Sequence, residues 1–310
     1  MNKILAVVVS YNRLALLQQC LQALLGQTAA CDTLVVDNAS TDDTKAWLEA
    51  FASGHETLYC ETMEKNLGGA GGFRFGMEWG LQHGYDYIWL MDDDTLPRPD
   101  ALEKLMEADE ILGGPNNYGF LSSTVLWKDG KECIMNHQRV VRHFYRYVHL
   151  LRYGILQIQQ ATFVSLLLPA STIRRFGYVF GEYFVWNDDI EYTRRIALKG
   201  KMPSFLVGQS VVIHAMEKNI GSDISTDDIA KLKRYQMMYR NEHNTYRREG
   251  LSGLLIYSVR WTRDIFRILV RAKDHRFKRI FAVLKGVIQG VFFRPVIEYP
   301  KDRPNGKTCD

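Results

Sequence analysis

The sequence of 310 residues has few cysteines, and no two of them form a Cys-x-x-Cys pair or the spacing of a zinc site. An odd, scattered set argues against a disulfide framework and fits a reducing cytoplasm. The N-terminus also lacks the cleavage site of a signal peptide, since a strand-like segment begins at once with Ile4. We therefore expect a cytoplasmic protein. The five cysteines are Cys20, Cys31, Cys60, Cys133 and Cys309.

Long hydrophobic runs are scarce as well. The uncharged stretch at 154–173 has the length of a membrane span, but it contains three glutamines and Pro169, so we interpret it as buried strand. The net charge is only +4, which does not by itself predict a nucleic-acid partner, and no nucleic-acid-binding module is visible. A hydrophobic content of 46% is enough for a sizeable core.

The first 110 residues alternate strand and helix patterns, which predicts an α/β fold with a mostly parallel, Rossmann-like sheet. In such sheets ligands bind beyond the carboxyl ends of the strands, so the polar segments there are the candidate site. Residues 111–220 are less regular, and we expect them to hold a second substrate. Residues 221–310 are predicted to be a helical, basic C-terminal region. The strand candidates in the first part are residues 4–9, 33–37, 57–61 and 86–91.

Three consecutive aspartates, Asp92, Asp93 and Asp94, follow the fourth strand candidate. Close like charges repel by roughly 1 kcal/mol or more at intermediate dielectric, unless a cation neutralises them. Carboxylate oxygens suit hard divalent ions such as Mg²⁺ or Mn²⁺, which commonly carry phosphates. The alternative is a solvated acidic turn before a helix that Asp100 caps.

A glycine-rich segment, Asn66 to Phe73, places four glycines in five positions ahead of a predicted helix that contains Met77. We interpret it as a loop whose backbone N–H groups approach a ligand, although it matches neither a P-loop nor G-x-G-x-x-G. Asp37 ends the second strand and suits a base or ribose, or else forms an Asx turn. Arg13 follows the first strand and is either a phosphate partner or a solvated charge.

A second acidic segment, residues 186–191, begins a predicted helix. Asp188 and Glu191 have the spacing of a capping box, which leaves Asp189 as the freer carboxylate to act as a general base towards a hydroxyl. Trp186 offers an apolar plate for a sugar ring. His214 ends a strand candidate and is either a metal ligand or an ordinary, partly exposed histidine.

These motifs occur in the order and spacing of inverting family-2 glycosyltransferases with the GT-A fold, which residues 3–216 resemble. Within that family, residues 66–73 and 186–191 are most similar to the bacterial galactofuranosyltransferases and next most similar to rhamnosyltransferases. The matching segments are Ser10–Arg13, Val36–Asp42, Asn66–Gly69, Asp92–Asp94 and Asn187–Tyr192.

The resemblance implies a role for each matched residue. Asp92 and Asp94 would hold Mn²⁺ or Mg²⁺, with His214 completing the metal shell. Asp189 would be the catalytic base, and the choice between Asp188 and Asp189 stays open. Asp37 would bind uracil or ribose, and Arg13 would lie beside the nucleotide. The remaining candidates are Asn66, Gly68, Gly69, Asp92 and Asp93 for the donor, and Trp186 and Glu191 for the acceptor.

The implied function is metal-dependent, inverting transfer of a sugar from a nucleotide-sugar donor. We expect galactofuranose from UDP-galactofuranose, added to a hydroxyl of a growing, lipid-linked bacterial surface glycan. A rhamnosyltransferase that uses dTDP-rhamnose is the first alternative. A catalytically idle GT-A relative that serves as a binding subunit, and a nucleotidyltransferase that would release pyrophosphate, are alternatives from other classes.

The C-terminal region carries its charge unevenly. Between residues 251 and 297 there are ten Lys or Arg against two acids, interleaved with aromatic residues. Each basic residue near an anionic leaflet contributes about 1 kcal/mol, so this pattern predicts contact with the inner face of a membrane. The alternative is a set of amphipathic helices that pack on the catalytic domain and expose a charged face.

Overall fold

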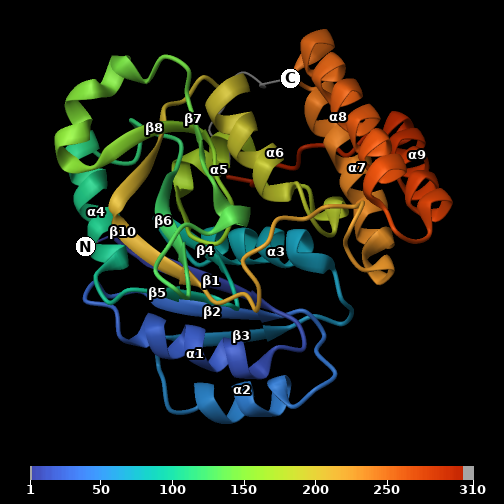
Figure 1. Ribbon diagram of the computed structural model, residues 1–310. Coiled ribbons are helices and arrows are strands. Elements are labelled where there is room, and N and C mark those ends of the chain that lie inside the picture. Colours follow the sequence, from blue (N-terminus) through green and yellow to red (C-terminus); the bar gives the residue numbers. More distant parts are fainter. Residues whose placement is uncertain (1, 303–310) are drawn as a thin grey trace.

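The computed structural model describes residues 2–302, and Figure 1 shows a central sheet with helices on both sides. Within these residues, ten strands form one sheet in the order β3-β2-β1-β4-β9-β6-β10-β8-β7, with β5 paired to β10 outside this path. The N-terminal strands pair in parallel, which confirms the predicted α/β class. They are β1 (Ile4–Ser10), β2 (Asp32–Asp37), β3 (Leu58–Thr62) and β4 (Tyr87–Asp92).

The second part of the sheet is mixed. β9 runs antiparallel to β4 and β6, while β10 runs parallel to β6 and antiparallel to β5 and β8. The uncharged stretch at 154–173 forms β8, β9 and the start of a helix, as the strand interpretation predicted. Among the described residues, no helix is both long and apolar enough to cross a membrane. These strands are β5 (Thr95–Pro97), β6 (Leu121–Trp127), β7 (Arg139–Val140), β8 (Ile155–Gln160), β9 (Leu166–Pro169) and β10 (Ser204–His214).

Two hydrophobic cores lie on the two faces of the sheet. Successive side chains of β1 alternate between them, because Ala6 and Val8 pack in one core while Val7 and Val9 pack in the other. One face is covered by α1 (Leu14–Leu25), α2 (Thr44–Ala52) and α4 (Ala101–Leu112). The other is covered by α3 (Gly68–Gln82), α5 (Ala170–Phe176) and α6 (Asp188–Arg194).

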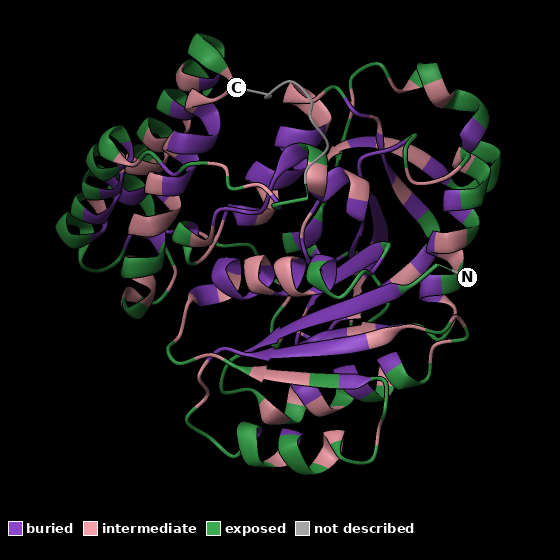
Figure 2. Ribbon diagram, turned by 180° about the vertical axis from the view of Figure 1, so that it is seen from behind, coloured by how far each residue is buried: buried purple, intermediate pink, exposed green. Residues whose placement is uncertain are grey.

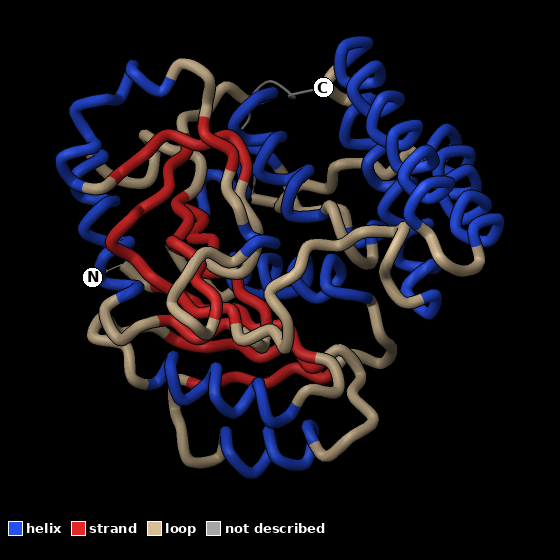
Figure 3. Tube along the Cα trace, in the orientation of Figure 1, coloured by secondary structure: helices blue, strands red, loops and turns tan. Residues whose placement is uncertain are grey.

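The described part of the C-terminal region is largely helical, as predicted, and the three helices within residues 232–292 pack together at one side of the sheet (Figures 1 and 3). Residues 303–310 of the predicted region lie outside the described residues. They have a separate small core that includes Tyr239, Ile268 and Val283. The helices are α7 (Leu232–Arg247), α8 (Gly250–Arg271) and α9 (Arg276–Phe292). Short helical turns elsewhere are η1 (Ile134–Asn136), η2 (Phe144–Tyr153), η3 (Gly181–Tyr183), η4 (Arg195–Lys199) and η5 (Ile229–Lys231).

The glycine-rich segment is helical, so the prediction of a loop over residues 66–72 was wrong. α3 already begins at Gly68 and lies close against β1. A Cβ on Gly72 would come 2.5 Å from Val9 Cγ1, and one on Gly76 would come 2.3 Å from Val7 Cγ1. Glycine therefore lets the helix approach the sheet. Low intrinsic helix propensity suggested a loop, but packing against the strand outweighs it.

We predict that Gly76→Ala destabilises the protein by about 1–3 kcal/mol, because the added methyl overpacks the contact between α3 and β1. Urea unfolding measures the loss. Gly69→Ala is the matched control in the same helix, since its Cβ would meet nothing nearer than Phe73 Cε2 at 4.0 Å. Equal unfolding free energies for the two variants would contradict this account of the glycines.

Candidate functional site

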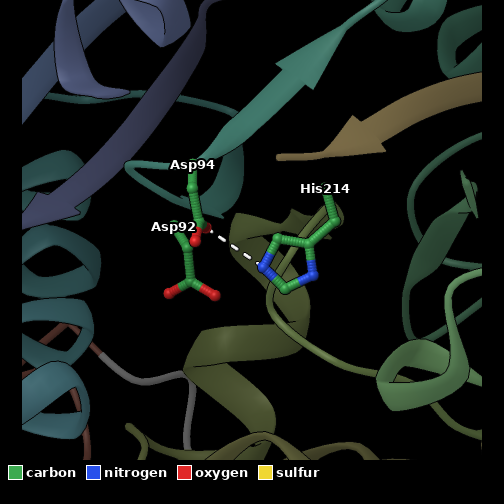
Figure 4. Close-up of side chains that lie close together, drawn as sticks. All are labelled: Asp92, Asp94 and His214. Atoms are coloured by element: carbon green, nitrogen blue, oxygen red, sulfur yellow. Dashed lines mark ion pairs between the residues drawn. The ribbon is translucent and has the colours of Figure 1, made fainter. Parts of the chain in front are cut away.

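The acidic triplet and His214 meet at the carboxyl ends of β4 and β10. Asp92 is the last residue of β4, and His214 is the last residue of β10. The short strand β5 pairs with β10 so that Thr95 lies opposite His214, and the Ala215 N–H donates to the Asp94 carbonyl at 2.8 Å. This register places His214 beside Asp94, as Figure 4 shows.

One ligand atom from each of Asp92, Asp94 and His214 lies within 4.8 Å of the others. The contact between His214 Nε2 and Asp94 Oδ1 is 3.1 Å long. Asp94 and His214 are 4% and 7% exposed, so their charges are poorly solvated. Burial, together with the Asp94 carboxylate, raises the pKa of Asp92 to about 7. The cluster therefore has an excess of negative charge in a place where water compensates little of it.

The same electrostatics appear at the histidine. Burial alone would lower the pKa of His214, but the neighbouring carboxylates of Asp94 and Asp92 raise it to about 10. Burial would likewise raise the pKa of Asp94, yet His214 and Arg13 hold it below its ordinary value. A positive charge at this point is thus strongly stabilised.

The donor atoms fit a divalent cation. Asp94 Oδ1 is buried, and His214 Nε2 faces it at 3.1 Å. Two carboxylates and one imidazole are ligands that Mn²⁺ accepts, and Mg²⁺ favours the carboxylate oxygens. Asp92, Asp94 and His214 are the residues that would hold the ion.

His214 is oriented by Asn136, a residue that the sequence analysis missed. His214 Nδ1 lies 2.7 Å from Asn136 Oδ1, and Asn136 Nδ2 donates to Thr162 Oγ1 at 2.8 Å. The second bond turns the amide oxygen towards the histidine, so the Nδ1–H donates and Nε2 faces the aspartates. Asn136 lies in η1, 78 residues before His214, and no sequence motif links the two.

Asp93 points to different partners than Asp92. Ser10 Oγ donates to Asp93 at 2.8 Å, and Arg13 Nη1 contacts Asp93 at 3.3 Å and Asp94 at 2.9 Å. The Arg13 side chain is 51% exposed. In this arrangement Arg13 neutralises part of the acidic triplet from the solvent side.

Residues from the end of β2 hold the start of α3. Asn38 Nδ2 donates to the Gly68 carbonyl at 2.8 Å, and Asn66 Oδ1 accepts from the Gly68 N–H at 2.7 Å. Gly68 has a φ of +72°, and a Cβ there would lie 2.0 Å from the Phe184 carbonyl oxygen. The Gly68 N–H is thus already used within the protein, and Gly68 contacts the segment that leads to Asp188.

Asp37 is fully buried beside this contact. One carboxylate oxygen accepts from the Ser40 N–H at 3.0 Å, three residues on, which is one residue further than in an Asx turn. The other oxygen, Oδ2, is buried without a hydrogen bond. An unsatisfied acceptor of this kind is costly unless a donor reaches it.

The second acidic segment begins α6, but not as a capping box. Asn187 is the N-cap, and no side chain caps the helix. Burial and the Asp189 carboxylate raise the pKa of Asp188 to about 8. Burial raises the pKa of Asp189 to about 7. The hydrogen bond from the Ile190 N–H lowers this pKa, while the nearby Asp92 carboxylate raises it further. Asp189 is therefore within electrostatic reach of the cluster at Asp92, and it is more exposed than Asp188.

The two predicted acceptor residues differ in their surroundings. Trp186 is partly exposed and packs edge-on against Tyr235 of α7, with ring centroids 5.1 Å apart. Glu191 is only 3% exposed, and Arg195 donates to both of its oxygens, at 3.0 and 2.5 Å. The prediction that Glu191 contacts an acceptor was wrong, because a buried ion pair within α6 and η4 already satisfies its carboxylate.

The segment before α6 is strained. Phe184, Trp186 and Asn187 have φ values of +66°, +64° and +69°. Bulky residues in this region cost on the order of 1–3 kcal/mol each, and they persist only where surrounding contacts hold them.

We predict that Asn136→Ala weakens Mn²⁺ binding about 10–100-fold, because His214 loses the partner that orients it. Titration calorimetry with Mn²⁺ alone, and again with UDP present, measures the change. Gln138→Ala is the matched control, since the Gln138 side chain donates to Ser122 Oγ and the Ser123 carbonyl near the same turn. Unchanged Mn²⁺ affinity in Asn136→Ala would refute the orienting role.

Comparison with known proteins agrees with the geometry. Residues 5–120 match the family model described as glycosyl transferase family 2. An undecaprenyl-phosphate mannosyltransferase from Micrococcus luteus is 34% identical over 138 residues, which are 43% of this chain and 55% of that protein. Galactofuranosyltransferase GlfT1 from Mycobacterium tuberculosis is 40% identical over 94 residues, 30% of this chain and 31% of that protein. The chain thus spans about half of the first relative's length and about a third of the second's.

Solved structures share the fold. GalNAc-T7 with UDP, GalNAc and Mn²⁺ superposes with a TM-score of 0.61 at 11% identity, over 80% of this chain and 48% of that one. Mannosyltransferase PcManGT from Pyrobaculum calidifontis, in complex with GDP-Man and Mn²⁺, has a TM-score of 0.51 at 15% identity, over 94% and 73% of the two chains. Residues 5–120 of this protein are therefore similar to glycosyl transferase family 2 domains, and the chain shares the GT-A fold of these solved structures.

Proposed function

We propose that this protein is an inverting, metal-dependent glycosyltransferase that moves a sugar from a nucleotide-sugar donor to an acceptor hydroxyl. The observation that carries the proposal is the meeting of Asp92, Asp94 and His214 in one cluster, with Asp189 within electrostatic reach of it. The similarity to family 2 domains and the GT-A fold support it.

The metal cluster would serve the leaving group. When bound by Asp92, Asp94 and His214, Mn²⁺ or Mg²⁺ would neutralise charge on the diphosphate. Arg13 lies beside the same carboxylates and is half exposed, which leaves its guanidinium accessible to a phosphate as well.

The donor's nucleoside would lie at the ends of β1 and β2. The unsatisfied Oδ2 of Asp37 suits an N–H of uracil or a ribose hydroxyl. Asp93 would act indirectly, since it fixes Arg13 and Ser10. Asn66, Gly68 and Gly69 would shape this pocket through the backbone at the start of α3, because the Gly68 N–H already bonds Asn66.

Asp189 is the better of the two candidate bases. The acceptor oxygen would attack the anomeric carbon of the donor while the bond between this carbon and the diphosphate oxygen breaks. The proton of the acceptor hydroxyl would pass to the Asp189 carboxylate. A base with a pKa near 7 is matched to neutral pH. Asp188 is more buried, with 8% of its surface exposed, and is less accessible to an acceptor. Trp186, partly exposed beside it, would carry the acceptor sugar.

The sugar and acceptor are inferred from the relatives. Similarity to galactofuranosyltransferase GlfT1 supports UDP-galactofuranose as donor. Similarity to an undecaprenyl-phosphate mannosyltransferase supports a lipid-linked acceptor, and it makes a mannosyl donor the second candidate. We propose the first combination, with addition to a lipid-linked bacterial surface glycan.

A lipid-linked acceptor would require contact with a membrane, and the C-terminal helices offer a surface for it. α8 and α9 expose many large apolar side chains, including Leu251 at 82%, Phe277 at 88% and Phe292 at 79%. Figure 2 shows exposed positions along both helices. Exposed cations lie among them at Arg271, Lys273, Arg276, Lys278 and Lys285.

This combination fits an anionic lipid surface better than water or nucleic acid. On α9 the exposed apolar residues follow helical spacing at positions 277, 281, 284 and 288, so they form one stripe along the helix. We propose that the protein is peripheral at the inner face of the membrane and that this stripe enters the interface.

The test of the function is nucleotide release from UDP-galactofuranose, UDP-galactopyranose, GDP-mannose and dTDP-rhamnose, each with Mn²⁺ and with EDTA. A lipid-linked galactoside acceptor is present throughout. We expect UDP release from the furanose donor alone, abolished by EDTA because the diphosphate loses its counter-ion. Release from another donor would reassign the sugar, and pyrophosphate as product would replace the transferase with a nucleotidyltransferase.

We predict that Asp189→Asn lowers the transfer rate at least about 100-fold and leaves the affinity for UDP and Mn²⁺ within a factor of about two, because only the proton acceptor is lost. Steady-state kinetics and calorimetry measure the two quantities. Asp188→Asn is the control and retains most of the rate. If instead Asp188→Asn is the inactive variant, the base is Asp188.

We predict that the protein floats with liposomes of anionic lipid and that the double variant Phe277→Ser/Phe281→Ser reduces the floated fraction at least about fivefold, since two aromatic side chains that would enter the lipid are lost. Tyr145→Ser is the control, because Tyr145 is 70% exposed in η2, outside the C-terminal helices. Failure of the wild type to float, or its elution as a dimer that the double variant breaks, would assign the surface to a second copy.

A further inference from the structure

The segment that precedes the candidate base is held from α7. Asn241, which has no exposed surface, donates from Nδ2 to three backbone carbonyls of this segment. The distances are 3.0 Å to Tyr183, 3.1 Å to Val185 and 2.9 Å to Trp186. An amide nitrogen has two hydrogens, so at least one of them is shared between two acceptors.

The orientation of the Asn241 amide is fixed on its other side. Arg240 donates to Asn241 Oδ1 from Nε at 3.0 Å and from Nη2 at 2.9 Å. The amide oxygen is therefore occupied, and the nitrogen must face residues 183–186. Arg240 Nη2 also reaches the carbonyls of Glu182 and Tyr183, at 2.8 and 3.2 Å.

These bonds coincide with the strained part of the chain. Phe184, Trp186 and Asn187 occupy the left-handed region. Asn241 binds the carbonyl of Trp186 itself and those of Tyr183 and Val185, which directly precede Phe184 and Trp186. A left-handed Phe or Trp reverts to an extended or helical conformation unless its peptide groups are held. Because α6 starts at Asp188, the direction of this segment sets where the Asp189 carboxylate lies.

We propose that Asn241 is a positioning residue for the reaction, which holds residues 183–187 in the conformation that directs Asp189 towards the metal cluster. The proposal rests on the proposed function. It gives the C-terminal helices a part in catalysis, separate from any contact with lipid. Asn241 reaches the backbone only, so it acts through Asp189 and not on the substrate.

The test is the variant Asn241→Ala, assayed with the donor that the wild type uses. We expect kcat to fall about 10–100-fold, since displacement of a reacting group by about 1 Å has effects of this size. The affinity for UDP with Mn²⁺ stays within a factor of about two, because β1, β2 and β4 are untouched. Asn241→Ser retains one hydrogen-bond donor, and we expect its kcat to lie between those of the wild type and Asn241→Ala. This variant also serves as the test if Asn241→Ala does not fold.

Tyr257→Phe is the matched control within the same bundle. Tyr257 is 2% exposed, and its hydroxyl donates to the Tyr239 carbonyl of α7 at 2.9 Å, so the variant loses a buried hydrogen bond without touching residues 183–187. We expect its kcat to equal that of the wild type. An unchanged kcat in Asn241→Ala and Asn241→Ser, or an equal loss in Tyr257→Phe, would overturn the proposal.

Hydrogen–deuterium exchange separates this proposal from the proposed function. If the wild type turns over no donor, the proposed function is wrong. Exchange of the amides at residues 183–189 still shows whether the Asn241 hydrogen bonds hold this segment. We expect faster exchange there in Asn241→Ala than in Tyr257→Phe. Equal exchange in the two variants would show that Asn241 does not hold the segment.

Discussion

The pairing of β5 with the end of β10 is the interaction on which the candidate site depends. It brings His214, from the second part of the sheet, against the acidic triplet from the first part. Asp94 of this triplet lies 120 residues before His214 in the chain. Several buried carboxylates close together are unfavourable unless positive charges lie nearby. His214 and Arg13 supply part of this positive charge. The site is thus stable as a set of opposed charges and is suited to a divalent cation.

The C-terminal helices connect to this site through α7, which bonds the segment before α6. α7 holds the segment before α6, while α8 and α9 pack on α7 and expose apolar side chains outward. The same bundle thus carries two distinct surfaces, an inner one made of buried amides and an outer one rich in aromatic and basic residues. A protein that works on a membrane-bound acceptor would benefit from having both on a rigid unit, because the position of the base relative to the lipid surface would then be fixed.

The glycines of α3 and the carboxylate of Glu191 illustrate where sequence patterns fall short. Four glycines in five positions predicted a loop, because glycine lowers helix propensity, but α3 forms there and packs so closely on β1 that a Cβ on Gly72 or Gly76 would clash with Val9 or Val7. The spacing of Asp188 and Glu191 fits a capping box as well as it fits many other arrangements. Whether Glu191 faces an acceptor or Arg195 depends on η4, whose path the spacing does not contain.

The sequence by itself determined the alternation of strands and helices, the parallel N-terminal sheet and the carboxylates at its edge, because these follow from periodicity and from the charge of neighbouring residues. Only the tertiary structure decided which oxygen of Asp94 faces His214, which amide orients His214 and which residue bonds the segment before Asp189. Asn136 lies 78 residues from His214, and Asn241 lies 55 residues after Trp186. Contacts over such separations are set by how the elements pack, and a single sequence carries no local pattern for them.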